Sequence, residues 1–543
     1  MKKHSRLIWV LFGLVLIIKI FIVYFRNGPF IFPDEGCIIQ RAIYFANTFE
    51  IKGCSELLNL PLGDAYPLYS ILLAPIYKFF HGILAYQLGL VLNAILVSSL
   101  IFPISGILNT YSNNKRFCII AAAITVFLPQ FTSYEKTLMT ETLYSSLMIF
   151  SLYFYVKSLS SAKRVNLNKI LTIFFAILLS LTRPLGFIFL IAIIINEFII
   201  SKNKKKILMI YLPLGVLMTF ISTHILSKGI AVALFANGRT LIETGNWQYA
   251  IRSISDQLNS FTIATLFIPL IIFSCCFFRR DFKKFSKLKY MILIYIIINF
   301  LVSAHHIVGY LLPLHYSPNL ITRYIHSSVI LIFICSLIFI NKYKSLQFSI
   351  GNTIFIIILL ISILFSDVEA FGFTLGFDMM PFLDFAAPKI EQDLVPTLEL
   401  YRKAILFVIF ALFFIVCLRM KKLLVAVGVA IITIFAITTY IAIQNYSKNP
   451  VFIKSLEQLN KSNIALVITP GDRNLLGEFW ALKSISKHNV KLVLFDSRNN
   501  YMIDNKMIEE SSDLNTADYI ISPIPSSLPI FGSTVDVYIY ENK

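Results

Sequence analysis

The sequence predicts an all-α polytopic membrane protein, with about thirteen spanning helices and a small C-terminal extracytoplasmic α/β domain. Composition, hydropathy and the spacing of apolar runs support this fold class. The chain of 543 residues is 57% hydrophobic and only 14% charged, and its mean hydropathy is +0.76. A soluble chain carries roughly 25% charged residues. A soluble core does not require so much apolar sequence, whereas a bilayer needs about 20 apolar residues for each spanning helix.

Apolar runs of spanning length recur along residues 1–445, which we expect to form the transmembrane domain. One shorter run, Pro67–Phe80, ends at Lys78 and His81, so we expect a helix at the membrane interface there. The expected spans are Leu7–Phe25, Ala85–Leu108, Phe117–Phe131, Glu141–Leu159, Ile170–Thr182, Leu185–Ile200, Ile207–Leu226, Phe261–Phe278, Tyr290–Leu312, Tyr324–Ile340, Ile350–Phe365, Ala404–Leu418 and Leu423–Ile443.

Charge placement predicts the orientation of these spans. The basic Met1–Arg6 segment precedes the first span without a cleavage site for a signal peptide, so we expect a cytoplasmic N-terminus. Alternate loops are then basic and cytoplasmic, and they are Lys115–Arg116, Lys163–Lys169, Lys202–Lys206, Arg279–Lys289, Lys342–Lys344 and Arg419–Lys422. The opposite loops are acidic, including a long first outer loop at residues 26–66. The net charge of +19 is therefore explained by topology, and no nucleic-acid partner is expected.

The composition changes from about Gln444, and residues 446–543 predict a small soluble α/β domain. Strands are expected at Ile464–Thr469, Lys491–Phe495, Tyr519–Ser522 and Val535–Tyr540, with a helix at Leu475–Ser486. An odd number of spans places this domain outside the cell.

The seven cysteines contain no metal-binding spacing. Five lie in or beside apolar runs and are interpreted as small core residues. Cys37 and Cys54 share the first outer loop, where they form either a disulfide, if the compartment is oxidising, or two free thiols.

Charges in or near a bilayer are costly and usually functional, and the first candidates lie in the outer loop at 26–66. Asp34 and Glu35 are adjacent carboxylates just after the first span. They are either a general base or metal ligand, or an acidic pair at a helix N-terminus, because a helix is expected from Ile38. Asp64 and Tyr66 close the same loop, and either face a cavity or begin an interfacial helix.

Further candidates lie at the outer ends of later spans. Lys136 and Glu141 belong to the polar segment Ser133–Thr142, and Arg183 lies between two short spans. An arginine in the outer half of a membrane should face protein, a carboxylate or an anionic lipid headgroup. The segment around His315, Tyr316, Arg323 and Tyr324 either binds a phosphate or anchors the interface. Together these residues predict one polar cavity open to the outer leaflet.

These motifs resemble the GT-C superfamily of membrane glycosyltransferases, in particular its protein O-mannosyltransferase and lipid A aminoarabinose transferase branch. The resemblance covers most of residues 1–345 and rests on five short motifs. They are Asp34–Glu35, Tyr66-Pro-Leu-Tyr69, Thr140-Glu-Thr142, Thr182-Arg-Pro184 and Arg323–Tyr324. The chain differs from the family pattern at Pro67, where many members have two prolines, and after Tyr324, where a proline often follows.

The resemblance implies a sugar donor on a polyprenyl phosphate and a hydroxyl acceptor on a protein, lipid or glycan. Asp34 would match the family's catalytic acid, Glu141 the second loop acid, and Arg183 and Arg323 the contacts to the lipid phosphate. The residues fit this chemistry independently, because a glycosyl phosphate carries its own leaving group. Such a reaction needs one base and cations for the departing phosphate, and a single displacement inverts the anomeric centre.

Other interpretations stay open from the sequence alone. A polymerase or ligase of lipid-linked oligosaccharides would also use outer arginines, and a secondary transporter would place ionisable groups near the midplane. No cofactor is certain, and a divalent metal held by Asp34, Glu35 or Asp64 is a further option. The abundance of Ile, Lys, Asn and Phe points to an AT-rich genome and, with an outer-leaflet donor, to a bacterial plasma membrane.

Overall fold

The computed structural model describes residues 2–24, 33–53, 67–160, 165–183, 185–200, 268–278, 283–306 and 321–342, the strands between 463 and 541, and a few isolated residues. The expected spans at 207–226, 404–418 and 423–443, and nearly all of the one at 350–365, lie outside this part. The chain divides into two compact units. The first comprises Met1–Ile17, Leu96–Ser133 and Leu143–Ala442, and the second Ile18–Ile95, Tyr134–Thr142 and Ile443–Lys543.

Long apolar helices occupy the first two expected spans. Helix α1 (Lys2–Tyr24) matches the first span, and α5 (Gly82–Ser99) and α6 (Ile101–Tyr111) together form the second. The break at Leu100 has a local cause: Pro103 has no backbone N–H to donate to Ser99, so the regular pattern is interrupted there. In the described part, Arg6–Val23, Leu84–Tyr111 and Phe285–Ser303 are long and apolar enough to cross a membrane.

The third expected span, Phe117–Phe131, is shorter than predicted. Helix α7 (Lys115–Thr125) ends before Pro129, which instead starts the short helix α8 (Pro129–Glu135). Proline is favoured in the first turn of a helix and disfavoured in its interior. The polar segment after Pro129 is therefore partly helical, and Glu135 is the last residue of α8.

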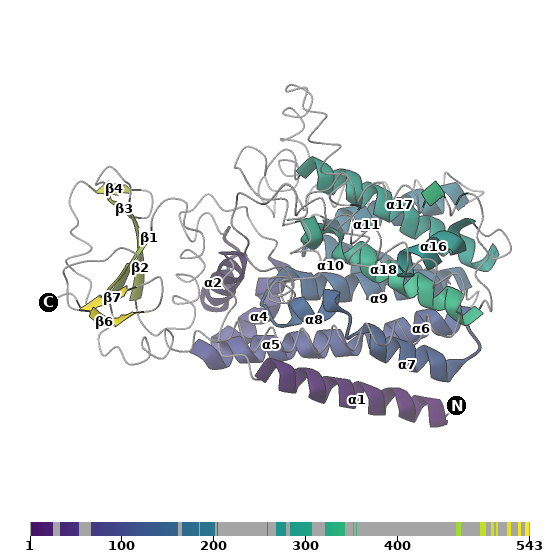
Figure 1. Cartoon of the computed structure of the whole chain (residues 1–543), viewed down its shortest axis with the longest axis horizontal. Helices are drawn as coiled ribbons and strands as arrows, with labels where there is room; N and C mark the ends of the chain where they lie inside the picture. The colour runs from purple at the N-terminus through teal and green to yellow at the C-terminus, as the bar shows by residue number, and fades with distance from the viewer. Residues whose placement is uncertain are drawn as a thin grey trace, which may run out of the picture. The chain divides into compact units, whose positions relative to one another are not determined.

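The later helices overlap the predicted spans. They are α9 (Thr140–Ser160), α10 (Val165–Ser180), α11 (Leu185–Ile200), α16 (Ile268–Phe278), α17 (Lys283–His306) and α18 (Ile321–Lys342). The overlap is close for α9 and α11 and less close for α10, α16 and α17. In Figure 1 these helices run along a common direction, and α10 packs on α11, α11 on α17, and α17 on α18. The total of about thirteen spans stays a prediction.

Contacts within the first unit support the alternating direction of the spans. The Asn341 amide donates to the Ser112 hydroxyl, and the rings of Tyr111 and Phe285 lie 5.3 Å apart. Lys169 Nζ donates to Glu197 Oε2 at 2.7 Å. Each of these residues lies at a helix end predicted to be cytoplasmic, so ends assigned to one side of the membrane contact one another.

In the second unit, a helix within the predicted outer loop packs against the helix that directly follows this loop. Helix α2 (Pro33–Thr48) begins earlier than the expected Ile38, and α4 (Leu68–Phe79) occupies the expected interfacial helix. The two helices pack against each other, and Ser70 Oγ donates to the Ile38 carbonyl at 3.0 Å. Because α4 has only 12 residues, or about 18 Å of helix, it is too short for a ~30 Å hydrocarbon core.

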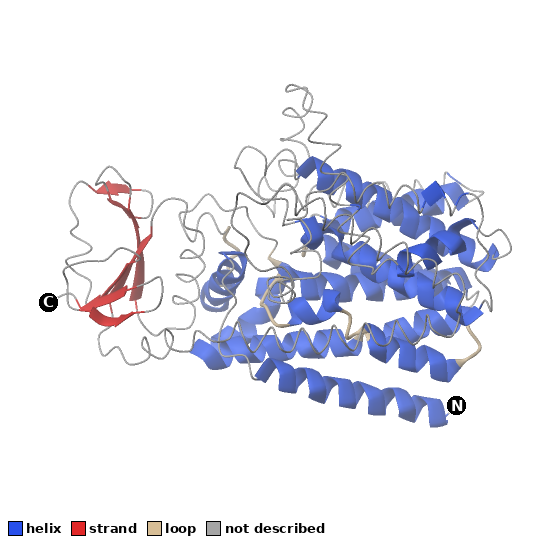
Figure 2. Ribbon diagram, viewed as in Figure 1, coloured by secondary structure: helices blue, strands red, loops and turns tan. Residues whose placement is uncertain are grey.

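The C-terminal segment forms a seven-stranded mixed sheet (Figure 2, red). Its order is β4-β3-β2-β1-β5-β7-β6, with strands β1 (Asn463–Ile468), β2 (Asn489–Phe495), β3 (Tyr501–Ile503), β4 (Lys506–Ile508), β5 (Tyr519–Ser522), β6 (Ile530–Ser533) and β7 (Tyr538–Glu541). The four expected strands are present as β1, β2, β5 and β7, whereas β3, β4 and β6 were not predicted.

The central strand pairs of this sheet are parallel. Strand β1 pairs in parallel with β2, with Asn463 opposite Asn489, and in parallel with β5. Parallel neighbours require a long crossover connection. The helix predicted at Leu475–Ser486 would supply it between β1 and β2, but it lies outside the described residues. The division of the chain at 445/446 stays a prediction.

Candidate functional site

One group of buried polar side chains in the second unit contains two of the four predicted acids, Glu35 and Glu141. We call it the acid cluster; its members come from α1, α2, α4, α5, α8 and the start of α9. They are Lys19, Glu35, Tyr69, Tyr86, Asn93, Glu135, Lys136 and Glu141. All eight are buried, although their polar groups would prefer water, so each must be compensated by protein contacts.

The carboxylate of Glu35 joins three segments of the chain. Pro33, Asp34 and Glu35 form the first turn of α2, where proline is favoured and acids interact well with the helix dipole. Glu35 Oε1 accepts hydrogen bonds from the Tyr86 hydroxyl at 2.9 Å and from the Leu138 N–H at 2.6 Å. Glu35 therefore ties α2 to α5 and to the turn that precedes α9. The side chain of its neighbour Asp34 lies outside the described part.

The side chain of Asn93 holds the same turn from α5. Its amide donates to the Thr137 carbonyl at 2.8 Å and more weakly to the Glu135 carbonyl at 3.4 Å. Its Oδ1 accepts from the Tyr69 hydroxyl at 2.6 Å. The amide of Asn93 thus donates to the two sides of the turn, while its oxygen accepts from Tyr69 of α4. The two donated bonds fix the backbone around Lys136.

The hydroxyl of Tyr69 is influenced by two carboxylates. Burial is the main cause that raises the pKa of Tyr69 well above its ordinary value, and the hydrogen bond to Asn93 opposes the rise. The negative charges of Glu35 and Glu141 raise the Tyr69 pKa further. Tyr69 is therefore a neutral donor at physiological pH, close enough to both carboxylates to feel their charge.

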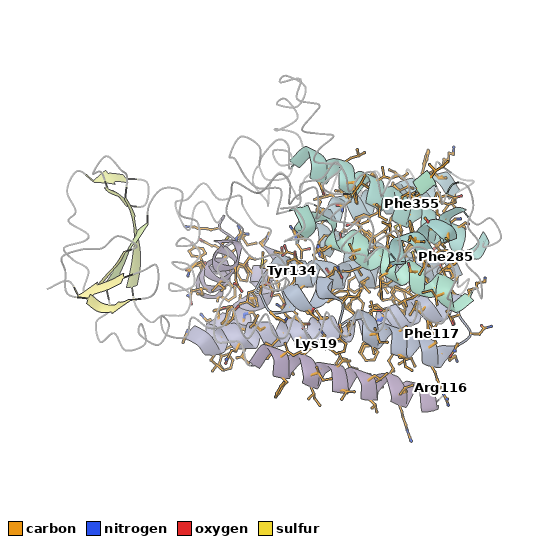
Figure 3. All side chains as sticks on the ribbon, in the orientation of Figure 1. Lys19, Arg116, Phe117, Tyr134, Phe285 and Phe355 are labelled. Carbon is orange, nitrogen blue, oxygen red and sulfur yellow. The ribbon has the colours of Figure 1, made fainter. Side chains whose placement is uncertain are left out.

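A buried ion pair connects α1 to the end of α8. Lys19 Nζ lies 2.5 Å from Glu135 Oε2, and both side chains are 0% exposed. Lys19 belongs to the membrane-spanning α1, and it is labelled in Figure 3. Most of that helix faces outward, with Trp9, Ile17 and Phe21 more than half exposed. The ammonium of Lys19 is therefore directed away from lipid, as expected for a charge in a span.

A second group of buried polar side chains lies in the first unit, and we call it the Arg183 cluster. Hydroxyl and amide groups from α9, α17 and α18 contact one another here. Its members are Tyr144, Ser145, Arg183, Tyr295, Asn299, His326, Ser327 and Ser328.

The backbone near Arg183 forms a tight turn between α10 and α11. The N–H groups of Thr182 and Arg183 both donate to the Leu179 carbonyl, and the Gly186 N–H donates to the Arg183 carbonyl. A Cβ atom at Gly186 would lie only 2.5 Å from backbone atoms of Leu179. The turn therefore requires glycine at position 186, and it leaves Arg183 only 8% exposed.

Short hydrogen bonds connect the spans of the Arg183 cluster. The hydroxyls of Tyr144 and Tyr295 lie 3.0 Å apart, and the Tyr295 hydroxyl lies 2.6 Å from Ser327 Oγ. Further bonds join Ser145 to His326 at 3.0 Å and Asn299 to Ser328 at 3.1 Å. Arg183 lies close enough to Tyr144 and Tyr295 for its positive charge to interact electrostatically with both hydroxyls. Among the described residues, this cluster brings several neutral hydroxyl groups together near one cation.

The structure places some of the predicted site residues in these clusters and leaves others undescribed. Glu35, Lys136 and Glu141 belong to the acid cluster and Arg183 to its own cluster. Arg323 and Tyr324 lie in the first turns of α18, but their side chains lie outside the described part. The undescribed predicted residues are Asp64, Tyr66, His315 and Tyr316.

Sequence reasoning missed several members of both clusters. Lys19 is a single lysine in an apolar span, which is a recognised signal for function. Tyr86, Asn93, Tyr144 and Tyr295 carry the same signal more weakly. His326 belongs to a motif assigned to phosphate binding or interface anchoring, and the structure buries it against Ser145 instead.

Two further predictions concern cysteines and metal. Cys37 is disulfide-bonded, which was one of the two alternatives left open for Cys37 and Cys54, while Cys54 lies outside the described residues. Within the described part of the chain, no group of three or more His, Cys, Asp and Glu side chains is placed to hold a metal ion. A divalent cation at Asp34, Glu35 or Asp64 stays a prediction, because two of these side chains are not described.

Comparison with known proteins identifies solved structures that share this architecture. No protein-family model and no curated protein matches the chain. A solved structure of ArnT from Cupriavidus metallidurans in the apo state is 12% identical, with a TM-score of 0.53 over 98% of this chain and 97% of that chain. ArnT from the same organism bound to undecaprenyl phosphate is 13% identical, with a TM-score of 0.52 over 98% of both chains. The chain has the fold of ArnT.

This likeness confirms part of what the motifs predicted. ArnT is a lipid A aminoarabinose transferase of the GT-C superfamily, so the predicted resemblance holds at the level of the fold. Together with the apolar helices, the ArnT-like fold shows that this chain is an integral, multi-pass membrane protein.

Proposed function

We propose that the chain is a membrane glycosyltransferase that moves a sugar from a polyprenyl phosphate to a hydroxyl acceptor at the outer face, with inversion. The acceptor is a protein, a lipid or a glycan. The observation that carries this proposal is the burial of Arg183 in a turn at the predicted outer end of two spans. A guanidinium buried in that position is suited to binding an anionic group of a substrate, such as the phosphate of a lipid-linked sugar.

The reaction needs three contributions from the chain. The bond between the anomeric carbon and the donor phosphate breaks, a bond from the acceptor oxygen to that carbon forms, and polyprenyl phosphate leaves. A carboxylate takes the acceptor proton, and we assign this role to Asp34 in the first turn of α2. Cations stabilise the leaving phosphate, and we assign Arg183, Lys136 and Arg323 to this role.

The other acids have supporting roles in this proposal. Glu35 already accepts two hydrogen bonds from the protein, so we assign it to holding the first turn of α2 rather than to the proton transfer. Glu141 begins α9 and is buried, and we assign it to orienting the acceptor. Asp64, Tyr66, His315, Tyr316 and Tyr324 are proposed to line the substrate site.

The ArnT-like fold supports the class of donor. A solved ArnT structure contains undecaprenyl phosphate, which is a polyprenyl phosphate of the kind that the proposal requires. We further propose a bacterial plasma membrane as the location of the chain. We also propose a cytoplasmic N-terminus and an extracytoplasmic C-terminal domain, because the positions of the basic loops and the contacts between helix ends predicted to be cytoplasmic support the same orientation.

Transfer in proteoliposomes tests the proposal. Purified wild-type chain would receive radiolabelled polyprenyl-phosphate sugars as donors and a membrane extract as acceptor. We expect donor-dependent transfer that falls by about 10²–10⁴-fold in Asp34→Asn, because the base is lost. Glu50→Gln is the matched control, since Glu50 is an exposed acid near the end of α2.

Two outcomes would overturn the proposal in different ways. Absence of transfer across a broad panel of polyprenyl-phosphate sugars would remove the glycosyltransferase function. Wild-type activity in a folded Asp34→Asn variant would keep the function and remove Asp34 as the base.

A further inference from the structure

The buried face of α4 ends in a tyrosine that lies beside the acid cluster. Tyr69, Leu73 and Tyr77 follow one another at intervals of about one helical turn, and all three are buried. Tyr77 is only 5% exposed, whereas Lys78 and Phe79, which follow it directly, are exposed. The side chain of Tyr77 is therefore directed into the protein, unlike those of its two neighbours.

Two contacts define how α4 lies along α5. The Tyr69 hydroxyl donates to Asn93 Oδ1 at 2.6 Å. One turn further along α4, Leu73 Cδ2 lies 3.3 Å from the position that a Cβ atom would take at Gly89. Each step of four residues forward in α4 is thus matched by a step of four residues backward in α5. The two helices are antiparallel, and this register can be continued to the end of α4.

The next step of this register brings Tyr77 level with the first turns of α5, where Tyr86 lies. The Tyr86 hydroxyl donates to Glu35 Oε1 at 2.9 Å, so the Glu35 carboxylate lies at the same level. Burial is the main cause that raises the pKa of Tyr77 well above its ordinary value, and the negative charge of Glu35 raises it further. The Tyr77 hydroxyl is therefore a neutral donor at physiological pH, close to a carboxylate.

The Tyr77 hydroxyl has no hydrogen-bond partner among the residues that the structure describes. The two buried tyrosines of the acid cluster differ from it, because Tyr69 and Tyr86 both donate to protein groups. Buried hydroxyls are nearly always hydrogen-bonded, since burial removes them from water. A buried donor that the protein leaves unused is suited to a ligand that brings its own acceptor.

The charge of Glu35 restricts the chemistry of such a ligand. The carboxylate would repel a phosphate placed next to Tyr77, whereas a neutral hydroxyl oxygen can accept from the phenol without this cost. Both substrates of the proposed reaction carry neutral hydroxyls, the acceptor on its reacting group and the donor on its sugar. Glu35 also directly follows Asp34, the base that we assign to the acceptor.

We propose that Tyr77 is a substrate-binding residue whose hydroxyl donates a hydrogen bond to a neutral hydroxyl oxygen of the acceptor or of the transferred sugar. This inference rests on the proposed function, which supplies substrates of this chemistry. The contact forms when the substrate binds, and it gives Tyr77 the partner that the described protein groups do not provide. Tyr77 binds and orients the substrate, and it neither takes nor gives up a proton.

Tyr77→Phe and Tyr69→Phe separate this role from a structural one. Each change removes one buried hydroxyl and keeps the aromatic ring. Tyr77→Phe removes a donor without a described partner, so the thermal midpoint should be unchanged or higher. Tyr69→Phe removes the 2.6 Å bond to Asn93, so the midpoint should fall. A Tyr77 hydroxyl that served only the fold would lower the midpoint in the same way.

Transfer kinetics and lipid binding, both measured on the full chain, test the inference. In proteoliposomes with radiolabelled polyprenyl-phosphate sugars and a membrane extract as acceptor, Tyr77→Phe should lower kcat/KM by about twofold to tenfold, the effect of one neutral hydrogen bond. A higher apparent KM for the extract would assign the contact to the acceptor, and a higher KM for the donor would assign it to the sugar. Binding of undecaprenyl phosphate, measured by native mass spectrometry in detergent, should be unchanged because this lipid contains no sugar.

Tyr44→Phe is the matched control, since the Tyr44 hydroxyl donates to the exposed Glu50 carboxylate at 2.9 Å; we expect wild-type transfer in this variant. Three results would overturn the inference and leave the proposed function standing. They are wild-type kcat/KM in Tyr77→Phe, an equal loss of undecaprenyl phosphate binding, and a midpoint as low as that of Tyr69→Phe. A wild-type chain that transfers no sugar would overturn both.

Discussion

The acid cluster and the Arg183 cluster both bury polar groups within or beside predicted membrane spans, but different contacts compensate those groups. In the acid cluster, the charged groups have described partners: Lys19 pairs with Glu135, and Glu35 accepts from the Tyr86 hydroxyl and the Leu138 N–H. In the Arg183 cluster, hydrogen bonds between neutral side chains join the spans, as in the pair Tyr144 and Tyr295.

This difference suggests different tasks for the two clusters. Compensated carboxylates are held in fixed positions, which suits residues that must accept a proton or orient a hydroxyl. A guanidinium is suited to bidentate binding of a phosphate that arrives with the substrate. We therefore expect substitutions in the Arg183 cluster to act on donor use, and those in the acid cluster to act on both stability and catalysis.

The largest expected effect sharpens this comparison at Arg183. Arg183→Met should lower the rate of sugar transfer by about 10²–10³-fold, because a cation that stabilises the leaving phosphate is lost. Arg183→Lys should recover only part of the rate, since an ammonium does not bind a phosphate in the bidentate manner of a guanidinium. The control is Arg116→Met, an exposed arginine in α7 (labelled in Figure 3). Equal rates for Arg183→Met and the control would remove Arg183 from the site.

The next effect concerns the stability of the acid cluster. Glu35→Gln replaces a carboxylate that accepts two short hydrogen bonds, and bonds to charged groups contribute about 1.5–3 kcal/mol each. We expect a clear decrease in the thermal midpoint, measured by intrinsic fluorescence in detergent, together with reduced transfer. An unchanged midpoint with abolished transfer would instead assign Glu35 to the chemistry.

A smaller effect is expected from the neutral network of the Arg183 cluster. Tyr295→Phe removes a hydroxyl that lies within hydrogen-bond distance of Tyr144 and Ser327, at a cost of about 0.5–1.5 kcal/mol for each bond. We expect a modest decrease in the thermal midpoint and a several-fold rise in the donor KM. Tyr290→Phe, at a 45% exposed position of the same helix, is the control and should change neither quantity.

The smallest effect tests whether burial distinguishes the two ion pairs. Lys169 is 38% exposed and pairs with Glu197, and exposed pairs contribute about 0–1 kcal/mol. Lys169→Met should therefore leave the thermal midpoint nearly unchanged. A decrease as large as that of Lys19→Met would show that burial is not the difference between the pairs.

The positions of several described spans could be predicted from the sequence because each depends on local hydropathy. The boundaries of α11 match the expected Leu185–Ile200, and α9 begins one residue before the expected start at Glu141. The error in the third span had a visible local signal, since Pro129 cannot continue a helix. The break at Leu100 depends on Pro103 in the same way.

The contacts of the candidate site were much harder to predict. Glu35 was expected to be catalytic, but its hydroxyl partner Tyr86 and the Leu138 N–H lie 51 and 103 residues away in the sequence. Lys19 and Glu135 are separated by 116 residues. Pairings at such separations depend on how the helices pack, which a single sequence does not encode in any local pattern.

The position of the donor phosphate tests the account most directly. The full chain in nanodiscs would be imaged by electron cryomicroscopy with undecaprenyl phosphate added. We predict phosphate density within hydrogen-bond distance, about 3 Å, of the Arg183 guanidinium. Phosphate density at the basic loops Lys202–Lys206 or Arg279–Lys289, with none at Arg183, would contradict the assignment of the donor site to the outer face.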